Sequence, residues 1–341
     1  MADRPAENID EYATSKKGGD LALTENTLGF APSDLIECRS CHRNNSPDRT
    51  GCLYCGHPFE LPSVRAEIAR VSYKRPELWE DGFSLVYSGN KELDGGIFKS
   101  ASDLLRLDES DLEKLLSIRS PVPLIYLRSL ADAQLLAFRL SEIGFDCAVV
   151  GDDLLQAETP PTRLRSVHFT GQAIVFSEFN TSKQFAIGID DRVLIVNGSI
   201  TKASTEERGK IKKRAFTTSS EVQSISVETV IDLYPASDVF GFRIRSAGFD
   251  FSGLGDHMKP FASANVIELV NQMRAQLKSA VFIDRFHSAK SLLDDIWVPD
   301  EVRQASEVSR GTLGGVQKRS ITVLDNSKQF TKYSRLQRHF I

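Results

Sequence analysis

The sequence lacks long apolar runs and has little excess charge. No segment approaches the roughly 18 to 20 uninterrupted apolar residues that a membrane-spanning helix requires, and residues 1–20 contain no apolar core of a secretory signal. The formal net charge is −4 in 341 residues, so the net charge of the chain does not indicate binding to nucleic acid or to a membrane. We therefore expect a cytoplasmic protein whose cysteines stay reduced.

Enzyme signatures are also missing. The sequence has no phosphate-binding loop, no dinucleotide glycine fingerprint, no Gly-x-Ser-x-Gly elbow and no His-Glu-x-x-His pair. Its 6 histidines are spread widely along the chain. The sequence therefore predicts a non-catalytic protein with no small-molecule substrate.

A cluster of four cysteines is the strongest positive signal. Cys38 and Cys41 form one Cys-x-x-Cys pair, and Cys52 and Cys55 form a second. Thiolates in two such turns suit a tetrahedral zinc ion, and a reducing compartment favours metal binding over disulfides. Segment 34–60 is thus expected to be a small module stapled by one structural zinc ion.

The second pair lies in the motif CLYCGHPF, and residues 36–60 resemble the bacterial zinc-ribbon family. The resemblance implies a ribbon that often presents a protein-binding or nucleic-acid-binding surface. Three other sites are conceivable for these cysteines. Residues 38–42 fit a haem c attachment signature, but that attachment requires an exported protein. A redox dithiol requires a βαβ setting, which does not surround this segment, and a catalytic zinc keeps one ligand position open, whereas four cysteines fill all four. The fifth cysteine, Cys147, lies in an apolar segment and is expected to be an inert buried thiol.

Beyond the cysteines, changes of composition predict a multidomain α+β fold. Residues 1–33 are polar and are expected to be a mobile lead-in. Residues 71–156 are expected to be a small α/β module in the order β-α-α-β-α-β. That order, with the segment PLIYLRSLADAQLLAFRLSEIGFDCAVV, resembles the Clp protease adaptor and the C-terminal domain of the ribosomal stalk protein. The expected strands are 83–87, 124–127 and 145–150, and the expected helices are 100–107, 109–117 and 129–143.

Residues 165–280 have a β-rich pattern. Short runs rich in Val, Ile and Phe predict strands, and an apolar stripe predicts a helix over 263–277. Six or seven strands closed by one helix resemble the pleckstrin homology superfold, which implies a β-barrel plugged by that helix. Pro160 and Pro161 mark 157–164 as a linker. The expected strands are 173–179, 184–189, 193–197, 216–218, 222–226, 229–233 and 241–246.

The first candidate binding segment is basic and covers residues 208–214. It is expected to be an inter-strand loop. Its charges are either simply solvated or, as the superfold resemblance implies, bind anionic lipid headgroups. Its candidate residues are Lys210, Lys212, Lys213 and Arg214.

The second candidate segment ends the chain, within a helical or extended basic tail expected over 281–341. Apolar residues recur there three or four positions apart, which predicts one face of a short helix. Such a face docks on a partner or on the chain itself, and the basic and aromatic residues also suit RNA. The candidate residues are Phe330, Tyr333, Arg335, Leu336, Arg338 and Phe340.

Binding-type modules without a catalytic set predict a zinc-containing adaptor or scaffold that binds a protein partner. The alternative is an RNA- or ribosome-associated factor that uses the ribbon and the basic aromatic tail. A further alternative is recruitment to an anionic membrane through 208–214.

Overall fold

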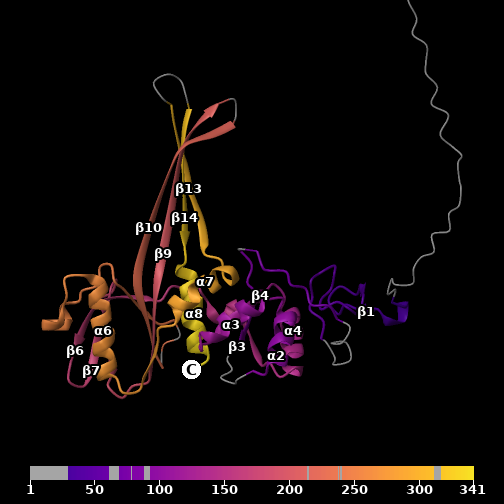
Figure 1. Cartoon of the computed structure of the whole chain (residues 1–341), viewed down its shortest axis with the longest axis horizontal. Coiled ribbons are helices and arrows are strands. Elements are labelled where there is room, and N and C mark those ends of the chain that lie inside the picture. The colour runs from indigo at the N-terminus through magenta and orange to yellow at the C-terminus, as the bar shows by residue number, and fades with distance from the viewer. Residues whose placement is uncertain are drawn as a thin grey trace, which may run out of the picture.

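The computed structural model shows a body from which a long β-arm projects (Figure 1). It describes residues 30–60, 69–77, 79–87, 93–212, 215–236, 238, 240–310 and 316–341, with the backbone alone for the described residues within 208–219 and 304–319. The fold is mixed α+β, as predicted, and its largest sheet curls into a half-barrel. Most of the expected lead-in, residues 1–29, lies outside the described part. A short 3-10 helix, η1 (Pro32–Asp34), precedes the two-stranded sheet of β1 (Ile36–Glu37) and β2 (Asn44–Asn45).

A three-stranded antiparallel sheet forms one part of the body. Its central strand is β3, with β4 on one side and β5 on the other. Its elements follow the predicted order β-α-α-β-α-β, and the short helix α5 comes after β5. The bounds are β3 Phe83–Tyr87, α2 Gly95–Leu105, α3 Glu109–Ser117, β4 Val122–Leu127, α4 Leu130–Glu142, β5 Cys147–Gly151 and α5 Asp152–Leu155.

The large sheet contains nine strands within the described residues. Their order is β13-β14-β9-β10-β11-β6-β7-β8, and β12 pairs in parallel with β9. A parallel pairing of β11 with β6 brings the end of the β-rich region back to its beginning. The bounds are β6 Thr162–Phe169, β7 Ala173–Glu178, β8 Gln184–Gly188, β9 Val193–Lys212, β10 Ala215–Pro235, β11 Phe242–Arg245, β12 Ala280–Ile283, β13 Asp300–Arg310 and β14 Val316–Asp325.

Two strands are far longer than the sequence predicted. β9 has 20 residues and β10 has 21, whereas one strand was expected at 193–197 and three at 216–233. The two strands pair along their length and leave the body as the arm, which β13 and β14 complete (Figure 1). The described side chains of 201–207 and 220–229 belong to neither large core, so these segments lack the apolar alternation of a half-buried strand. The predicted linker was also too long, because β6 starts at Thr162.

Different helices cover the two faces of the large sheet. The predicted helix over 263–277 is found as α6 (Ala262–Gln276), which buries Leu269 and Met273 against one face. α7 (Phe286–Ile296) and α8 (Ser327–His339) belong to a second core, shared by the large sheet and the three-stranded sheet. Trp297 Nε1 donates to Ser84 Oγ at 3.1 Å in this buried region. The segment 281–341, expected to be a tail, is therefore built into the fold.

Candidate metal centre and binding surfaces

The four predicted cysteine ligands come together at one point. Their sulfur atoms all lie within 4.8 Å of one another. Cys38 Sγ is 3.6 Å from Cys55 Sγ, and Cys41 Sγ is 3.5 Å from Cys52 Sγ. Thiolates held about 2.3 Å from a tetrahedral zinc ion are about 3.8 Å apart. The cluster therefore has the dimensions of a four-thiolate metal site, and all four sulfurs are free of disulfides.

Two tight turns direct the sulfur atoms inward. In the first turn, His42 N donates to Cys38 O at 2.8 Å. In the second, Gly56 N donates to Cys52 O at 3.0 Å, and Gly56 has a φ of 74°. Glycine adopts this left-handed conformation without the steric penalty of a Cβ. The glycine that follows the second cysteine pair thus allows the chain to turn back over the metal ligands.

Hydrogen-bond donors surround the sulfur of Cys52. Asn45 Nδ2 lies 3.5 Å and Tyr54 N lies 3.4 Å from this atom. Burial raises the pKa of Cys52, but these donors and a second backbone N–H lower it to about 6. A hydrogen bond from Arg43 lowers the pKa of Cys41, but burial and the neighbouring thiols raise it more, to about 12. Without a cation, one thiol of the cluster loses its proton readily while its neighbour keeps it. A cation at the centre would stabilise all four thiolates at once.

One buried carboxylate joins the cysteine module to the three-stranded unit. Asp132 lies in the first turn of α4 and is 4% exposed. Its Oδ1 accepts from Thr50 Oγ1 and from Ser72 N, each at 2.9 Å. Thr50 and Asp132 are 82 positions apart in the chain, so no local pattern indicated this contact. The module is therefore anchored to α4 rather than joined to it by the chain alone.

The apolar stripe predicted near the C-terminus forms one face of α8. Phe330, Tyr333 and Leu336 are fully buried, and Phe340 packs against the same core. The Phe286 ring lies 4.9 Å from the Phe330 ring and 5.2 Å from the Tyr333 ring. The stripe docks on the chain itself, one of the two destinations that the sequence left open. Its buried rings are not available for stacking on RNA.

The basic residues of α8 also make contacts within the chain. Arg335 is 5% exposed, and its guanidinium donates to backbone carbonyls that follow β5 and β10. Arg338 lies with its guanidinium 5.9 Å from the centre of the Tyr234 ring. The carbonyls that Arg335 contacts are those of Leu155, Gln156, Thr159 and Phe240. Arg335 therefore fastens α8 to two connecting segments.

The predicted basic loop at 208–214 is mostly strand. Lys210 pairs with Thr217, and Lys212 pairs with Ala215, in the β9–β10 ladder. Lys213 and Arg214 lie outside the described residues. The expectation of a loop was wrong here because the pairing of β9 with β10 continues far beyond the half-barrel. Lys210 and Lys212 thus belong to the distal part of the arm.

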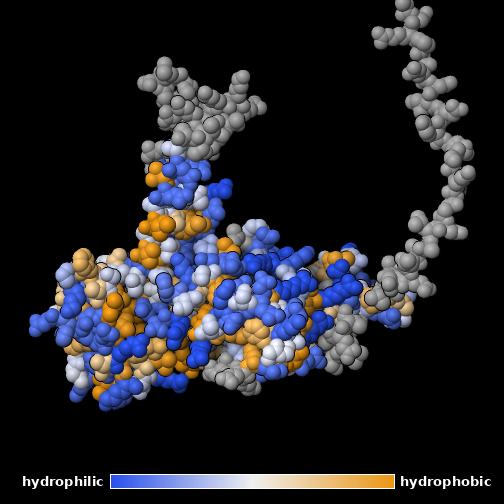
Figure 2. Space-filling model, viewed as in Figure 1, coloured by the Kyte–Doolittle hydropathy of each residue, from blue (hydrophilic) through white to orange (hydrophobic). Residues whose placement is uncertain are grey.

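Sequence reasoning missed an exposed stretch of the arm, residues 220–228, which we call the β10 edge. β10 pairs with β9 on one side and with β11 only over 230–233, so no described strand covers the other side of this edge. Val222, Ile225 and Val227 are 57%, 71% and 66% exposed. Figure 2 shows apolar residues among polar ones on the described part of the arm. The sequence signal for this edge was the presence of β-branched residues at both odd and even positions of 220–228, which places apolar side chains on both faces of one strand.

The fifth cysteine is a partly buried thiol that packs against the core. Cys147 lies in β5, opposite Tyr87 of β3. Burial, with a contribution from the charge of Asp146, raises the pKa of the Cys147 thiol to about 12. The thiol is therefore protonated at neutral pH, which supports the expectation that it is unreactive.

Within the described residues, no helix combines the length and the apolar character needed to cross a membrane.

The resemblances to the zinc-ribbon family, the Clp protease adaptor, the ribosomal stalk protein and the pleckstrin homology superfold stay predictions. Function has to be argued from the geometry of this chain. Comparisons with protein-family models, curated proteins and solved structures found no match to it.

Proposed function

We propose that this chain is a non-catalytic, zinc-containing scaffold that holds a protein partner on its β-arm. The observation that carries the proposal is the β10 edge, a long exposed strand edge with β-branched apolar side chains. In this proposal the cysteine module and the two larger sheets form the body that supports the arm. Its place of work is the cytoplasm, where the four thiols stay reduced.

Zinc is the metal that we assign to the cysteine centre. Thiolates suit zinc, and four of them close its shell with no position for water or substrate. The role is structural because segment 34–60 has almost no core of its own. Apart from cysteines, Ile36 is its one buried apolar side chain. A ribbon of this size depends on its metal to fold.

The architecture of the body supports a binding role. The half-barrel carries α6 across one face, the arrangement implied by the resemblance to the pleckstrin homology superfold. The three-stranded unit has the order β-α-α-β-α-β, on which the sequence resemblance to the Clp protease adaptor rests. Both resemblances are to proteins that act by binding, which fits a scaffold better than an enzyme.

The β10 edge has few of the features that protect strand edges: the irregularity in its ladder with β9 lies at its start, between Thr218 and Ser220. Native proteins blunt exposed edges with lysine, proline or bulges, because free N–H and C=O groups recruit further strands. Residues 220–228 contain no lysine, arginine or proline. A strand added to this edge would complete the ladder and cover Ile225 and Val227, as in binding by strand addition.

The occupant that fits is an extended segment of another protein, apolar at alternate positions and flanked by basic residues. Of the two acidic residues of the β10 edge, Glu228 is already paired with Arg245, so Glu221 supplies the exposed charge of this edge. Two copies of this edge would bring like charges onto one short ladder, whereas a partner with Lys or Arg complements them. We therefore assign the edge to a different protein rather than to a second copy.

The test begins with capture of the tagged full-length protein from the cells that produce it, followed by isolation of the stoichiometric partner. Binding of that partner is then measured for the wild type, Ile225→Lys and Ile267→Lys. Ile267 is a matched control in α6, 65% exposed against 71% for Ile225. Lysine on an edge opposes strand addition, so Ile225→Lys should weaken binding at least tenfold, or by about 1.4 kcal/mol.

Amide hydrogen exchange supplies a readout specific to strand addition. The partner should slow exchange within residues 220–228 and leave α6 unchanged. Equal affinity of the wild type and Ile225→Lys, or no protection at the β10 edge, contradicts the proposal. Recovery of RNA that vanishes with nuclease, in place of a protein partner, would favour the RNA-associated alternative.

A further inference from the structure

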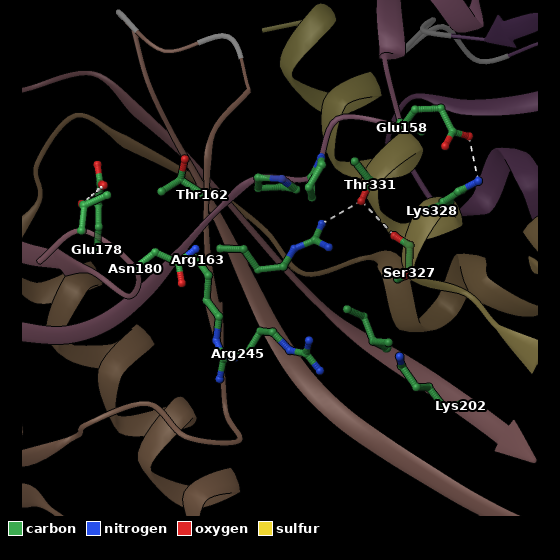
Figure 3. Close-up of a pocket in the computed structure, with 16 residues that line it drawn as sticks. Glu158, Thr162, Arg163, Glu178, Asn180, Lys202, Arg245, Ser327, Lys328 and Thr331 are labelled. Carbon is green, nitrogen blue, oxygen red and sulfur yellow. Dashed lines mark hydrogen bonds and ion pairs between the residues drawn. The ribbon is translucent and has the colours of Figure 1, made fainter. Parts of the chain in front are cut away.

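A cavity of about 710 Å³ lies where the half-barrel meets α8 (Figure 3). It is lined by the start of β6, the turn between β7 and β8, parts of β9 and β11, and the first turn of α8. None of its lining residues belongs to the cysteine centre or to the β10 edge. A cavity of this size accommodates a small organic molecule.

Cations dominate the lining of this cavity. Figure 3 shows Arg163 and Arg245 on one side of it and Lys202 and Lys328 on the other. Two carboxylates, those of Glu158 and Glu178, also line it. The five basic lining residues are Arg163, Lys202, Arg243, Arg245 and Lys328.

The carboxylates that pair with two of the arginines lie behind the lining. Asp232 Oδ1 accepts from Arg243 Nε at 2.6 Å, and Asp232 Oδ2 accepts from Arg243 Nη2 at 2.8 Å. Glu228 accepts from Arg245 Nε at 3.0 Å. Neither carboxylate lines the cavity, so a ligand would meet the guanidinium groups first. The pairing fixes both arginines in position before any ligand arrives.

The two lysines are also paired, but their side chains are accessible. Lys202 Nζ lies 2.7 Å from Asp325 Oδ2, and Lys328 Nζ lies 2.7 Å from Glu158 Oε1. The lysine side chains are 47% and 42% exposed. Asp325 is only 19% exposed, and Lys328 Nζ also lies 3.3 Å from Asp300 Oδ2, so these carboxylates compete with an anion in the cavity for both ammonium groups.

Arg163 has a donor that no described group satisfies. Its Nε is buried without a hydrogen-bond partner. Its Nη2 donates to Ala247 O at 2.9 Å, and the guanidinium lies 4.1 Å from the centre of the Phe179 ring. A buried donor left unpaired destabilises the fold. An acceptor atom of a bound ligand would remove that destabilisation.

The first turn of α8 adds a second feature suited to an anion. α8 begins at Ser327, and both Ser327 and Thr331 line the cavity. Ser327 N already donates to Asp325 Oδ1 at 2.8 Å, so this end favours a further negative charge through its dipole and the N–H groups that follow Ser327. The arginines and this helix end therefore border the same cavity.

We infer that this cavity binds a ligand with a phosphate group, held by Arg163, Arg245 and the first turn of α8. A phosphate presents oxygens in several directions, which matches guanidinium groups of Arg163 and Arg245 on one side of the cavity and the start of α8 at Ser327 on the other (Figure 3). A single carboxylate would leave most of these donors unused. The ligand is bound and not converted, and the inference does not depend on the proposed scaffold function.

The experiment is calorimetric titration of the metal-loaded full-length protein with inorganic pyrophosphate. Asn180→Glu adds a negative charge at an exposed lining position, and Arg163→Gln removes a positive one. Gln172→Glu is the matched control, because it makes the same charge change on an exposed turn outside the lining. Each lining variant should bind pyrophosphate at least tenfold more weakly, which is about 1.4 kcal/mol, and the control should bind within twofold of the wild type.

A flotation assay distinguishes the two sources of a phosphate group. Vesicles of phosphatidylcholine are compared with and without phosphatidic acid, which carries a phosphate monoester. Binding to pyrophosphate alone identifies a soluble ligand, and retention on the phosphatidic acid vesicles that Asn180→Glu abolishes identifies a lipid headgroup. The inference is overturned if neither probe binds, or if binding is unchanged in Asn180→Glu, a variant whose folding circular dichroism verifies.

Discussion

The contact between Gly198 and Phe330 offers a quantitative test of whether α8 is part of the core. Gly198 lies in β9, and a Cβ added to it would come within 2.2 Å of Phe330 Cε2. The Phe330 ring is fully buried and also packs against Phe286, so it cannot move aside freely. Gly198→Ala should therefore lower the free energy of unfolding by about 1–3 kcal/mol, the usual cost of overpacking.

Phe330→Ala removes the obstacle and leaves a cavity in its place. The substitution alone should cost about 3–5 kcal/mol, as expected for a fully buried phenylalanine. In that background the methyl group of Gly198→Ala enters vacant space instead of a ring. The two substitutions should therefore cost less together than the sum of their separate effects, with a coupling of about 1–3 kcal/mol.

Urea denaturation followed by the fluorescence of buried Trp297 measures these free energies. Phe261→Ala is the control: this side chain is 74% exposed, so its removal should change stability by no more than about 0.5 kcal/mol. If Phe330→Ala is as mild as Phe261→Ala, or if the effects at Gly198 and Phe330 are additive, then α8 does not pack as described.

Three further predictions concern the metal centre and the carboxylates of Asp132 and Glu228. Cys52→Ser should abolish stoichiometric zinc in elemental analysis of the purified protein; a full zinc complement would contradict a four-cysteine site. Asp132→Ala leaves the Thr50 hydroxyl without its acceptor and should cost about 1–3 kcal/mol, with faster amide exchange in the cysteine module; unchanged exchange would refute the anchoring role. Burial raises the pKa of Glu228, but hydrogen bonds from Arg245 and a backbone N–H lower it below its ordinary value of 4.5. A carboxylate with a lowered pKa contributes stability above pH 4.5, and this stability is lost as the pH falls through the folded-state pKa. Glu228→Gln should therefore lose less stability than the wild type on acidification below pH 4.5. Parallel profiles of stability against pH for the two proteins would disprove this.

Local patterns predicted several elements of the three-stranded unit with their bounds. β3 at 83–87 and α3 at 109–117 have the expected bounds, because apolar spacing and acidic residues in the first helical turn are written into a few neighbouring residues. The stripe of α8 was visible for the same reason. The site on which the stripe packs was not visible in the sequence, because that site is formed by segments far away in the chain.

The arm shows where local reasoning stops. Its ladder is set by pairing between remote segments, as when Ala203 of β9 lies beside Leu324 of β14. Serine and threonine in exposed strands resemble turn residues, so the sequence divided β10 into three pieces. The metal ligands were predictable because coordination chemistry dictates their spacing. The basic cavity was not, because Arg163 and Lys328 meet only after the half-barrel and α8 have come together.

The central claim is that a partner strand occupies the β10 edge, and site-specific photo-crosslinking tests it most directly. A photoreactive residue replaces Ile225 in one full-length sample and Ile267 in another, and each is irradiated with the isolated partner. We expect a crosslink from position 225, mapped to an extended segment of the partner, and little from position 267. Efficient crosslinking at 267 with none at 225 would contradict it.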